Sequence, residues 1–218
     1  MMPGPDQVVA CPHCKGLGKY MTLMSGNTFG ARVWTDGKQV ARMLPRPPAV
    51  VKCRHCGKCY WLADAEQVGA LDPWSGGERQ VDPTWAAEEV QEPAEEEYYA
   101  AIEGGLAVDP QQERKLRVFA WWRGNDAFRD ASRAQAGDIG SASGARRNNL
   151  KALASLLHDG DENDRIMKAE ILRELGEFES AMEVLRTITS SEYGAVVRQL
   201  WSMCESKDMC VRELVFSA

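Results

Sequence analysis

Four cysteines form the most specific chemical pattern in the sequence, as two Cys-x-x-Cys pairs separated by a long insert. The pairs are Cys11–Cys14 and Cys53–Cys56. Two residues between cysteines allow a tight turn to present both sulfurs to one ion, and Gly57 tolerates the left-handed backbone that completes such a turn. Two such turns supply the four thiolates of a tetrahedral zinc site. The spacing therefore predicts one structural Zn²⁺, because four sulfurs leave no coordination position open for water.

Two alternatives to zinc stay open at this point. Iron in a rubredoxin-like site has the same ligand geometry, and a redox Cys-x-x-Cys pair has the same spacing, although a redox pair is expected in a thioredoxin-like βαβ setting. We expect His13 and His55, which lie inside the pairs, to point away from the ion. Cys59 is expected to be a bystander, and Cys204 and Cys210 to be buried small apolar groups.

Charge is distributed unevenly along the 218 residues, whose formal net charge is -6. Residues 1–70 carry 9 Lys/Arg against 4 Asp/Glu, whereas residues 71–218 carry 17 against 28. Four thiolates and one Zn²⁺ lower the charge of the first region to about +3, a weak surface for phosphate. The candidate nucleic-acid-binding residues of this region are Lys15, Lys19, Arg32, Arg42, Arg46, Lys52, Arg54 and Lys58.

The sequence lacks the signals of membrane insertion and secretion. No stretch approaches the 18 or more apolar residues, roughly, that a spanning helix needs. The first residues have neither a positive region nor a long apolar run, so a secretory signal is not expected. We therefore expect a reducing, cytoplasmic location, where paired cysteines more often bind metal than form disulfides. Seven cysteines, an odd number, also argue against a closed disulfide framework.

The elements that must position the cysteines change along the chain. Residues 1–10 are expected to be a disordered lead, and residues 11–63 a β domain in which Asp36-Gly37 marks a hairpin turn. Residues 64–92 are expected to be a linker rich in turn residues. Residues 93–218 are expected to be helical. The fold class predicted from this order is α+β, with a small antiparallel β domain followed by all-α helical hairpins.

Apolar periodicity and end signals locate the helices more closely. Pro93 and the glutamates after it favour a helix start, and Asp109-Pro110 favours the start of the next helix. A third helix is expected over about 146–158. The strongest pair is expected on either side of Gly176, the first helix capped by Asp164 or Asn163 and the second running to Ile188. A last helix is expected over about 192–205, and the apolar segment 209–216 is compatible with a strand or a helix.

Two segments resemble known families. Residues 11–63, with Cys11-Pro12-x-Cys14, the hairpin and Cys53-x-x-Cys56-Gly57, resemble the zinc-ribbon superfamily. Zinc ribbons bind DNA, RNA or protein, or brace a fold. Residues 162–195 resemble one tetratricopeptide repeat, with its small and large apolar positions at Ala169, Leu172, Gly176, Phe178, Ala181 and Leu185. The chain as a whole resembles uncharacterised bacterial proteins that join a zinc ribbon to tetratricopeptide-like helices.

No catalytic pattern emerges from the sequence. A phosphate-binding loop, a dinucleotide-binding glycine pattern and a nucleophile elbow are all missing. The densest cluster of large and polar groups is Trp121-Trp122-Arg123, residue types that commonly anchor protein partners. We therefore expect a non-enzymatic adaptor with a structural zinc ion and a helical surface for another protein. The alternative is a nucleic-acid-binding regulator that uses the basic first region, and an enzyme is a third possibility.

Overall fold

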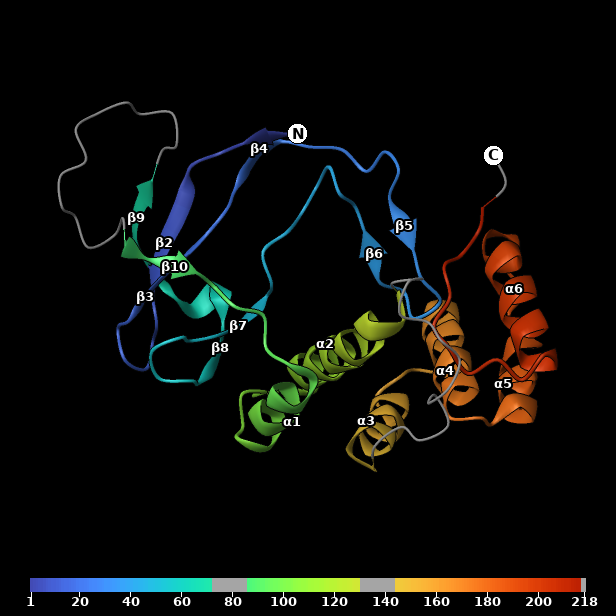
Figure 1. Ribbon diagram of the computed structural model, residues 1–218. Coiled ribbons are helices and arrows are strands. Elements are labelled where there is room, and N and C mark those ends of the chain that lie inside the picture. The colour runs from blue at the N-terminus through green and yellow to red at the C-terminus, as the bar shows by residue number, and fades with distance from the viewer. Residues whose placement is uncertain (72–85, 130–143, 217–218) are drawn as a thin grey trace. The chain divides into compact units, whose positions relative to one another are not determined.

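The computed structural model describes residues 1–71, 86–129 and 144–216 (Figure 1). Contacts between residues divide the chain into two compact units. The first comprises Met1–Ala31 and Ala41–Leu106, and the second comprises Arg32–Val40 and Ala107–Ala218. The predicted α+β class is confirmed, because small sheets precede a series of helices. The unit boundaries differ from the predicted ones, because residues 32–40 belong to the helical unit and not to the unit that contains the cysteine pairs.

A four-stranded sheet is the main element of the first unit. Strand β2 (Asp6–Ala10) lies inside it and pairs antiparallel with both β3 and β9. Val8 and Val9 are 0% and 2% exposed, so the expected disordered lead is wrong. The reason is that this apolar run is buried between β3, which is close in sequence, and β9, which is about 60 residues away. The other strands of the sheet are β3 (Leu17–Tyr20), β9 (Glu66–Leu71) and β10 (Glu88–Glu89).

The described ends of the predicted linker are therefore strands, β9 and β10, while residues 72–85 lie outside the described part of the chain. The described part of the first unit also contains two short antiparallel strand pairs, a 3-10 helix at Leu62–Asp64 and one α-helix. The helix, α1 (Glu95–Glu103), begins with three glutamates as predicted, and the Glu97 carboxylate accepts from the Ala94 N–H at 2.9 Å. The strand pairs are β1 (Met2–Pro3) with β4 (Leu23–Ser25), and β7 (Val50–Lys52) with β8 (Cys59–Trp61).

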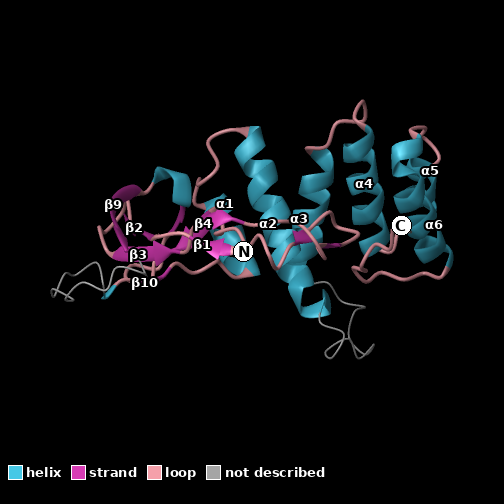
Figure 2. Ribbon diagram, turned by 90° about the horizontal axis from the view of Figure 1, so that it is seen from above, coloured by secondary structure: helices cyan, strands magenta, loops and turns pink. Residues whose placement is uncertain are grey.

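Five helices build most of the second unit, and each contacts the next one along the chain (Figure 2). The predicted helices are all present. The N-cap of α4 is Asp161 and not the predicted Asp164 or Asn163. The Asp161 carboxylate accepts from the N–H of Asp164 at 3.1 Å. The helices are α2 (Pro110–Arg129), α3 (Gly144–Ser155), α4 (Glu162–Glu174), α5 (Phe178–Leu185) and α6 (Gly194–Glu205).

Two apolar clusters hold these helices together, and α4 contributes to both. Trp121, Leu153 and Ile171 are central in the cluster formed by α2, α3 and α4. Ala169 and Leu185 belong to the cluster of α4, α5 and α6. None of the described helices is both long and apolar enough to cross a lipid bilayer.

The tight α4–α5 turn depends on a glycine and on small side chains. Gly176 has a φ of 81°, a conformation that residues with a Cβ rarely adopt. Ala169 and Ala181 are buried, at 1% and 0% exposed, and leave room for the two helices to approach closely. These positions are among those that suggested the tetratricopeptide resemblance.

A hairpin from the N-terminal third of the sequence completes the second unit. Strands β5 (Arg32–Val33) and β6 (Gln39–Val40) pair as the Asp36-Gly37 signal predicted, and Gly37 has a φ of 78°. Residues 212–214 of the segment 209–216 bond to this hairpin, but the segment forms neither a strand nor a helix beyond one isolated β-bridge. The Leu214 N–H donates to the carbonyl of Val33 at 2.8 Å, and the backbones of Trp34 and Glu213 form an isolated antiparallel β-bridge.

Candidate metal centre

The four predicted ligands converge in the first unit. The sulfur atoms of Cys11, Cys14, Cys53 and Cys56 all lie within 4.8 Å of one another. The Cys11 and Cys56 sulfurs are 3.9 Å apart, and the Cys14 and Cys53 sulfurs are 3.6 Å apart. Four sulfurs around one ion at a Zn–S distance of about 2.3 Å would be about 3.8 Å apart in a tetrahedron. The donor set and its spacing therefore fit a tetrahedral metal ion.

The two cysteine pairs lie on turns with the same backbone pattern. In each turn the first cysteine donates to a carbonyl five residues later, and its own carbonyl accepts from the residue four positions later. The equivalence explains how segments 42 residues apart present their sulfurs in the same way. The bonds, all 2.9 Å long, are Cys11 to Gly16, Lys15 to Cys11, Cys53 to Lys58 and Gly57 to Cys53, each from N–H to carbonyl.

One backbone position in each turn has a positive φ. Gly57 has φ 73°, as its place after the second pair predicted. The equivalent residue in the first turn is Lys15, with φ 60°. The first turn therefore holds a residue with a Cβ in a conformation that favours glycine.

The electrostatics of the cluster favour a bound cation. Burial by itself raises the pKa of Cys53, but the amide N–H groups of Cys56 and His55 and the neighbouring thiols lower it to about 7. At Cys14 the Gly16 N–H lowers the pKa, yet local desolvation of this exposed residue and the three other thiols outweigh the donor and raise the pKa to about 12. Several thiolates cannot share this space without a compensating charge, which a divalent ion supplies.

The flanking histidines and the third cysteine are not part of the sulfur cluster. The His55 ring lies 3.3 Å from the carbonyl of Leu17, and a Cβ on residue 16 would clash with it. His13 meets the ring of Tyr60 edge-on, with the ring centroids 6.5 Å apart. Cys59 is half-buried on β8.

The other two cysteines lie in the helical unit. Cys204 is 2% exposed, which agrees with the expectation of a buried apolar group. Cys210 is only partly buried, and its carbonyl accepts from the Arg173 guanidinium at 2.7 Å.

Most of the basic nucleic-acid candidates are paired with carboxylates of the chain itself. Arg32 belongs to the second unit, where it pairs with Glu213 at 2.5 Å. Among the described residues, Arg42, Arg46 and Lys58 have no ion pair. The remaining pairs are Lys15–Glu66, Lys19–Asp6, Lys52–Glu97 and Arg54–Glu88.

The three partner-binding candidates have different environments. Trp121 is 0% exposed and donates from its indole to Glu174 at 2.9 Å, so it is a core residue and not a surface anchor. The sequence pattern could not separate it from Trp122, which is half-buried and donates to the carbonyl of Asp36 at 2.9 Å. Arg123 is exposed and contacts Asp126 at 3.4 Å.

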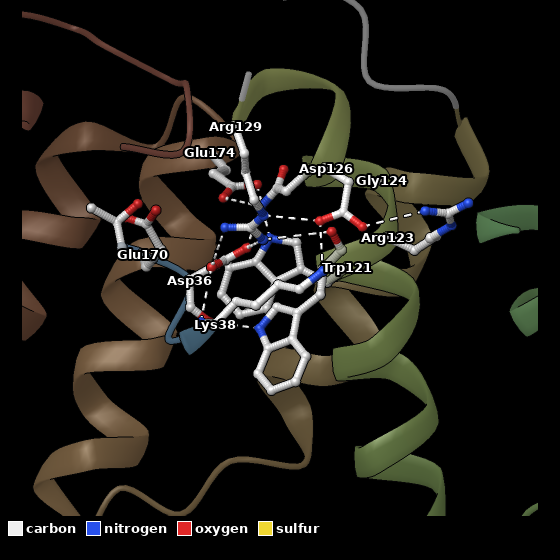
Figure 3. Close-up of polar contacts among 12 residues, drawn as sticks. Asp36, Lys38, Trp121, Arg123, Gly124, Asp126, Arg129, Glu170 and Glu174 are labelled. Atoms are coloured by element: carbon white, nitrogen blue, oxygen red, sulfur yellow. Dashed lines mark hydrogen bonds and ion pairs between the residues drawn. The ribbon is translucent and has the colours of Figure 1, made fainter. Parts of the chain in front are cut away.

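A buried polar cluster around Asp36 was not predicted from the sequence (Figure 3). The Asp36 carboxylate is 0% exposed and pairs with the Arg129 guanidinium, one of whose bonds is 3.1 Å long. The Asn125 amide donates to Asp36 and to Glu174, both at 2.9 Å. The cluster therefore fixes the turn of the hairpin against α2 and α4. No local signal could reveal it, because the partners of Asp36 lie about 90 residues further along the chain.

Glu174 is the unusual acid of this cluster. Burial raises the pKa of Glu174 to about 8. The neighbouring Glu170 carboxylate is the next largest cause, and Asp36 acts in the same direction. Arg146, at 3.6 Å, and the Trp121 indole act in the opposite direction. With a pKa of about 8, Glu174 keeps its proton near neutral pH.

Comparisons with protein-family models, with curated proteins and with solved structures found no match. The fold and the cysteine cluster therefore carry the functional argument. They define an α+β protein with a four-cysteine site suited to a metal ion in one unit and a series of paired helices in the other.

Proposed function

We propose that the chain is a non-enzymatic adaptor in which one Zn²⁺ stabilises the first unit and the helices of the second unit bind a partner protein. The cysteine cluster supports the structural role of the metal. Its four sulfurs fill a tetrahedral shell and leave no position for a substrate or an activated water molecule. Zinc is preferred to iron because it is the commoner occupant of structural four-cysteine sites.

The observation that carries the adaptor proposal is the consecutive packing of α2 to α6 (Figure 2). Helical pairs stacked in this way form extended surfaces on which other proteins are bound. The small residues Ala169 and Ala181 and the turn at Gly176 give the α4–α5 pair the close approach that such repeats use.

The charges of the first unit favour the adaptor over the nucleic-acid alternative. Four of its seven basic candidates face carboxylates, as does Arg32 in the second unit, which reduces the positive potential available to phosphates. Only Arg42, Arg46 and Lys58 remain without an ion pair among the described residues. Nucleic-acid binding that is strong at low salt, falls steeply with added salt and is lost in R42E/R46E would favour the alternative.

The metal proposal is tested by metal analysis of the purified chain and of matched cysteine variants. We expect one zinc per wild-type chain and per Cys59→Ser chain. Cys11→Ser should lower the zinc affinity by more than about 100-fold, beyond what loss of an outer hydrogen bond costs. Iron in place of zinc, or a folded Cys11→Ser chain with full zinc content, would contradict the proposal.

The adaptor role is tested by affinity purification of the full chain from its native host, with nuclease treatment as a control. We expect one protein to be recovered in near-stoichiometric amount and to survive the nuclease. R42E/R46E in the first unit serves as the matched surface variant and should retain this protein. Recovery of nucleic acid alone, or of no protein above background, would refute the role.

A further inference from the structure

The second unit has an open groove between the first half of α2 and the end of α3. Its volume is about 640 Å³, within the range of about 300–1,000 Å³ that ligand sites usually occupy. The groove is separate from the cysteine cluster, because all of its lining belongs to the helical unit. The lining residues are Pro110, Gln111, Arg114, Lys115, Val118, Phe119, Trp122, Leu156 and His158.

Apolar side chains form much of the groove wall. The rings of Phe119 and Trp122 lie with their centroids 5.9 Å apart at an angle of 51°. The indole N–H of Trp122 is bonded to the Asp36 carbonyl, so this ring offers the groove an apolar surface. Val118 and Leu156 add aliphatic surface beside the rings. An aliphatic or aromatic side chain placed here would be removed from water on contact with these groups.

The ionisable residues that line the groove are all of basic types. Arg114, Lys115 and His158 line it, and none of the lining residues in the described part of the chain is a carboxylate. Arg114 is paired with Asp164, with one bond of 3.0 Å. Lys115 and His158 are exposed, and within the described parts of the chain their side chains have no ion pair. This basic groove lies within residues 71–218, where acidic residues outnumber basic ones by 28 to 17.

We propose that the groove binds a short peptide segment of a partner protein that carries an aliphatic or aromatic residue next to an aspartate or glutamate. The apolar residue lies against Phe119 and Trp122, and the carboxylate lies near Lys115 and His158. Charge complementarity selects this occupant, because a carboxylate meets only basic groups at the groove. This inference rests on the adaptor role and specifies which surface of the helical unit is used.

The test is a peptide-display selection against the immobilised full chain, in parallel with Lys115→Glu. We expect wild-type selections to enrich an apolar residue within two or three positions of Asp or Glu. A synthetic peptide from that selection should bind Lys115→Glu with about three- to tenfold lower affinity, because attraction becomes repulsion. Selections on Lys115→Glu should shift toward Lys and Arg beside the apolar residue, a change that loss of folding could not produce.

Lys151→Glu, an exposed charge reversal on α3 outside the groove lining, is the matched control and should bind the selected peptide like the wild type. Equal loss in both variants, or enrichment without an acidic residue, would overturn the groove proposal. So would a self-association of the chain that Lys115→Glu abolishes, since the occupant would then be a second copy. If affinity purification recovers a partner that binds Lys115→Glu normally, the groove proposal fails while the adaptor role stands.

Discussion

Lys15 holds a backbone conformation that glycine adopts in the equivalent turn. A left-handed conformation costs a residue with a Cβ about 1–2 kcal/mol of folding free energy. Glycine avoids this cost, but it gives up more conformational entropy on folding, which offsets part of the gain. We therefore expect Lys15→Gly to raise the free energy of unfolding of the zinc-loaded chain by about 0.5–1 kcal/mol. Urea denaturation with zinc in excess measures this difference.

Two control substitutions isolate the backbone effect. Gly57→Ala should lower the free energy of unfolding by about 1 kcal/mol, because its φ is 73°. The added Cβ would meet nothing within 4 Å, so this change reports the backbone strain without a steric clash. Lys15→Ala removes the exposed Lys15–Glu66 contact, 3.4 Å long, without relieving the backbone, and should change little. A Lys15→Ala chain as stable as Lys15→Gly would contradict this explanation.

Glu174 makes the stability of the helical unit depend on pH. Its pKa is raised from 4.5 to about 8 by burial, so between these values the folded chain holds a proton that the unfolded chain has released. Raising the pH through this window therefore lowers the free energy of unfolding, by at most about 1.4 kcal/mol per pH unit. We expect Glu174→Gln to remove this part of the slope between pH 6 and 8.

Urea denaturation of the wild type and of Glu174→Gln at several pH values measures the difference between their pH slopes. The contributions of cysteine and histidine titration to the slopes are the same in both chains and therefore cancel. Glu179→Gln, an exposed change on α5, should keep the wild-type slope. Identical slopes for wild type and Glu174→Gln would show that Glu174 is ionised in the folded chain.

At the scale of elements, a single buried carboxylate is central to the docking of the β5–β6 hairpin. Asp36→Ala would remove the buried partner of the Arg129 guanidinium, whose side chain is 8% exposed and keeps its 3.0 Å contact with the partly exposed Asp126. Removing one member of a buried pair costs about 3–5 kcal/mol. We expect this loss in the unfolding of the second unit, together with faster amide hydrogen exchange at residues 32–40 and 212–214. Arg123→Ala, which removes an exposed 3.4 Å contact, should leave exchange unchanged.

The helices and the grouping of the four cysteines could be predicted because their signals are local. Apolar residues at helical spacing, the Asp109-Pro110 start and the stop at Gly176 each involve neighbours in the sequence. The Cys-x-x-Cys turns are equally local, and the chemistry of four thiolates then requires the two turns to meet.

The sheet and the hairpin docking could not be predicted in this way, because their determinants are distant. Val8 pairs with Lys19 on one side and with Gly69 on the other, and nothing in residues 1–10 indicates the second partner. Asp36 likewise looks like an ordinary turn residue until Asn125 and Arg129 are brought beside it. Trp121 is buried inside the cluster that α2 forms with α3 and α4, whereas Trp122 is only partly buried against that cluster.

At the scale of the whole molecule, each unit has its own source of stability. The first unit has small apolar clusters, one of which includes Cys11 and Cys53, whereas the second has two extended helical clusters. Because metal binding supplies folding free energy in small domains, a strong chelator should unfold the first unit preferentially. Circular dichroism should then keep most of the helical signal, while amide exchange accelerates in β2, β3 and β7. Simultaneous loss of helix would contradict independent stability.

Residues 32–40 lie between the two segments of the first unit in the sequence but fold as part of the second unit. This arrangement sets an order of events during synthesis. Proteins emerge from the ribosome N-terminus first, at roughly 5–20 residues per second, and domains usually fold in that order. Here the hairpin leaves the ribosome long before α2, α4 and the segment around Leu214 that receive it. The nascent chain must therefore keep this hairpin available, as a loop between segments of the first unit, until the segment around Leu214 has been made.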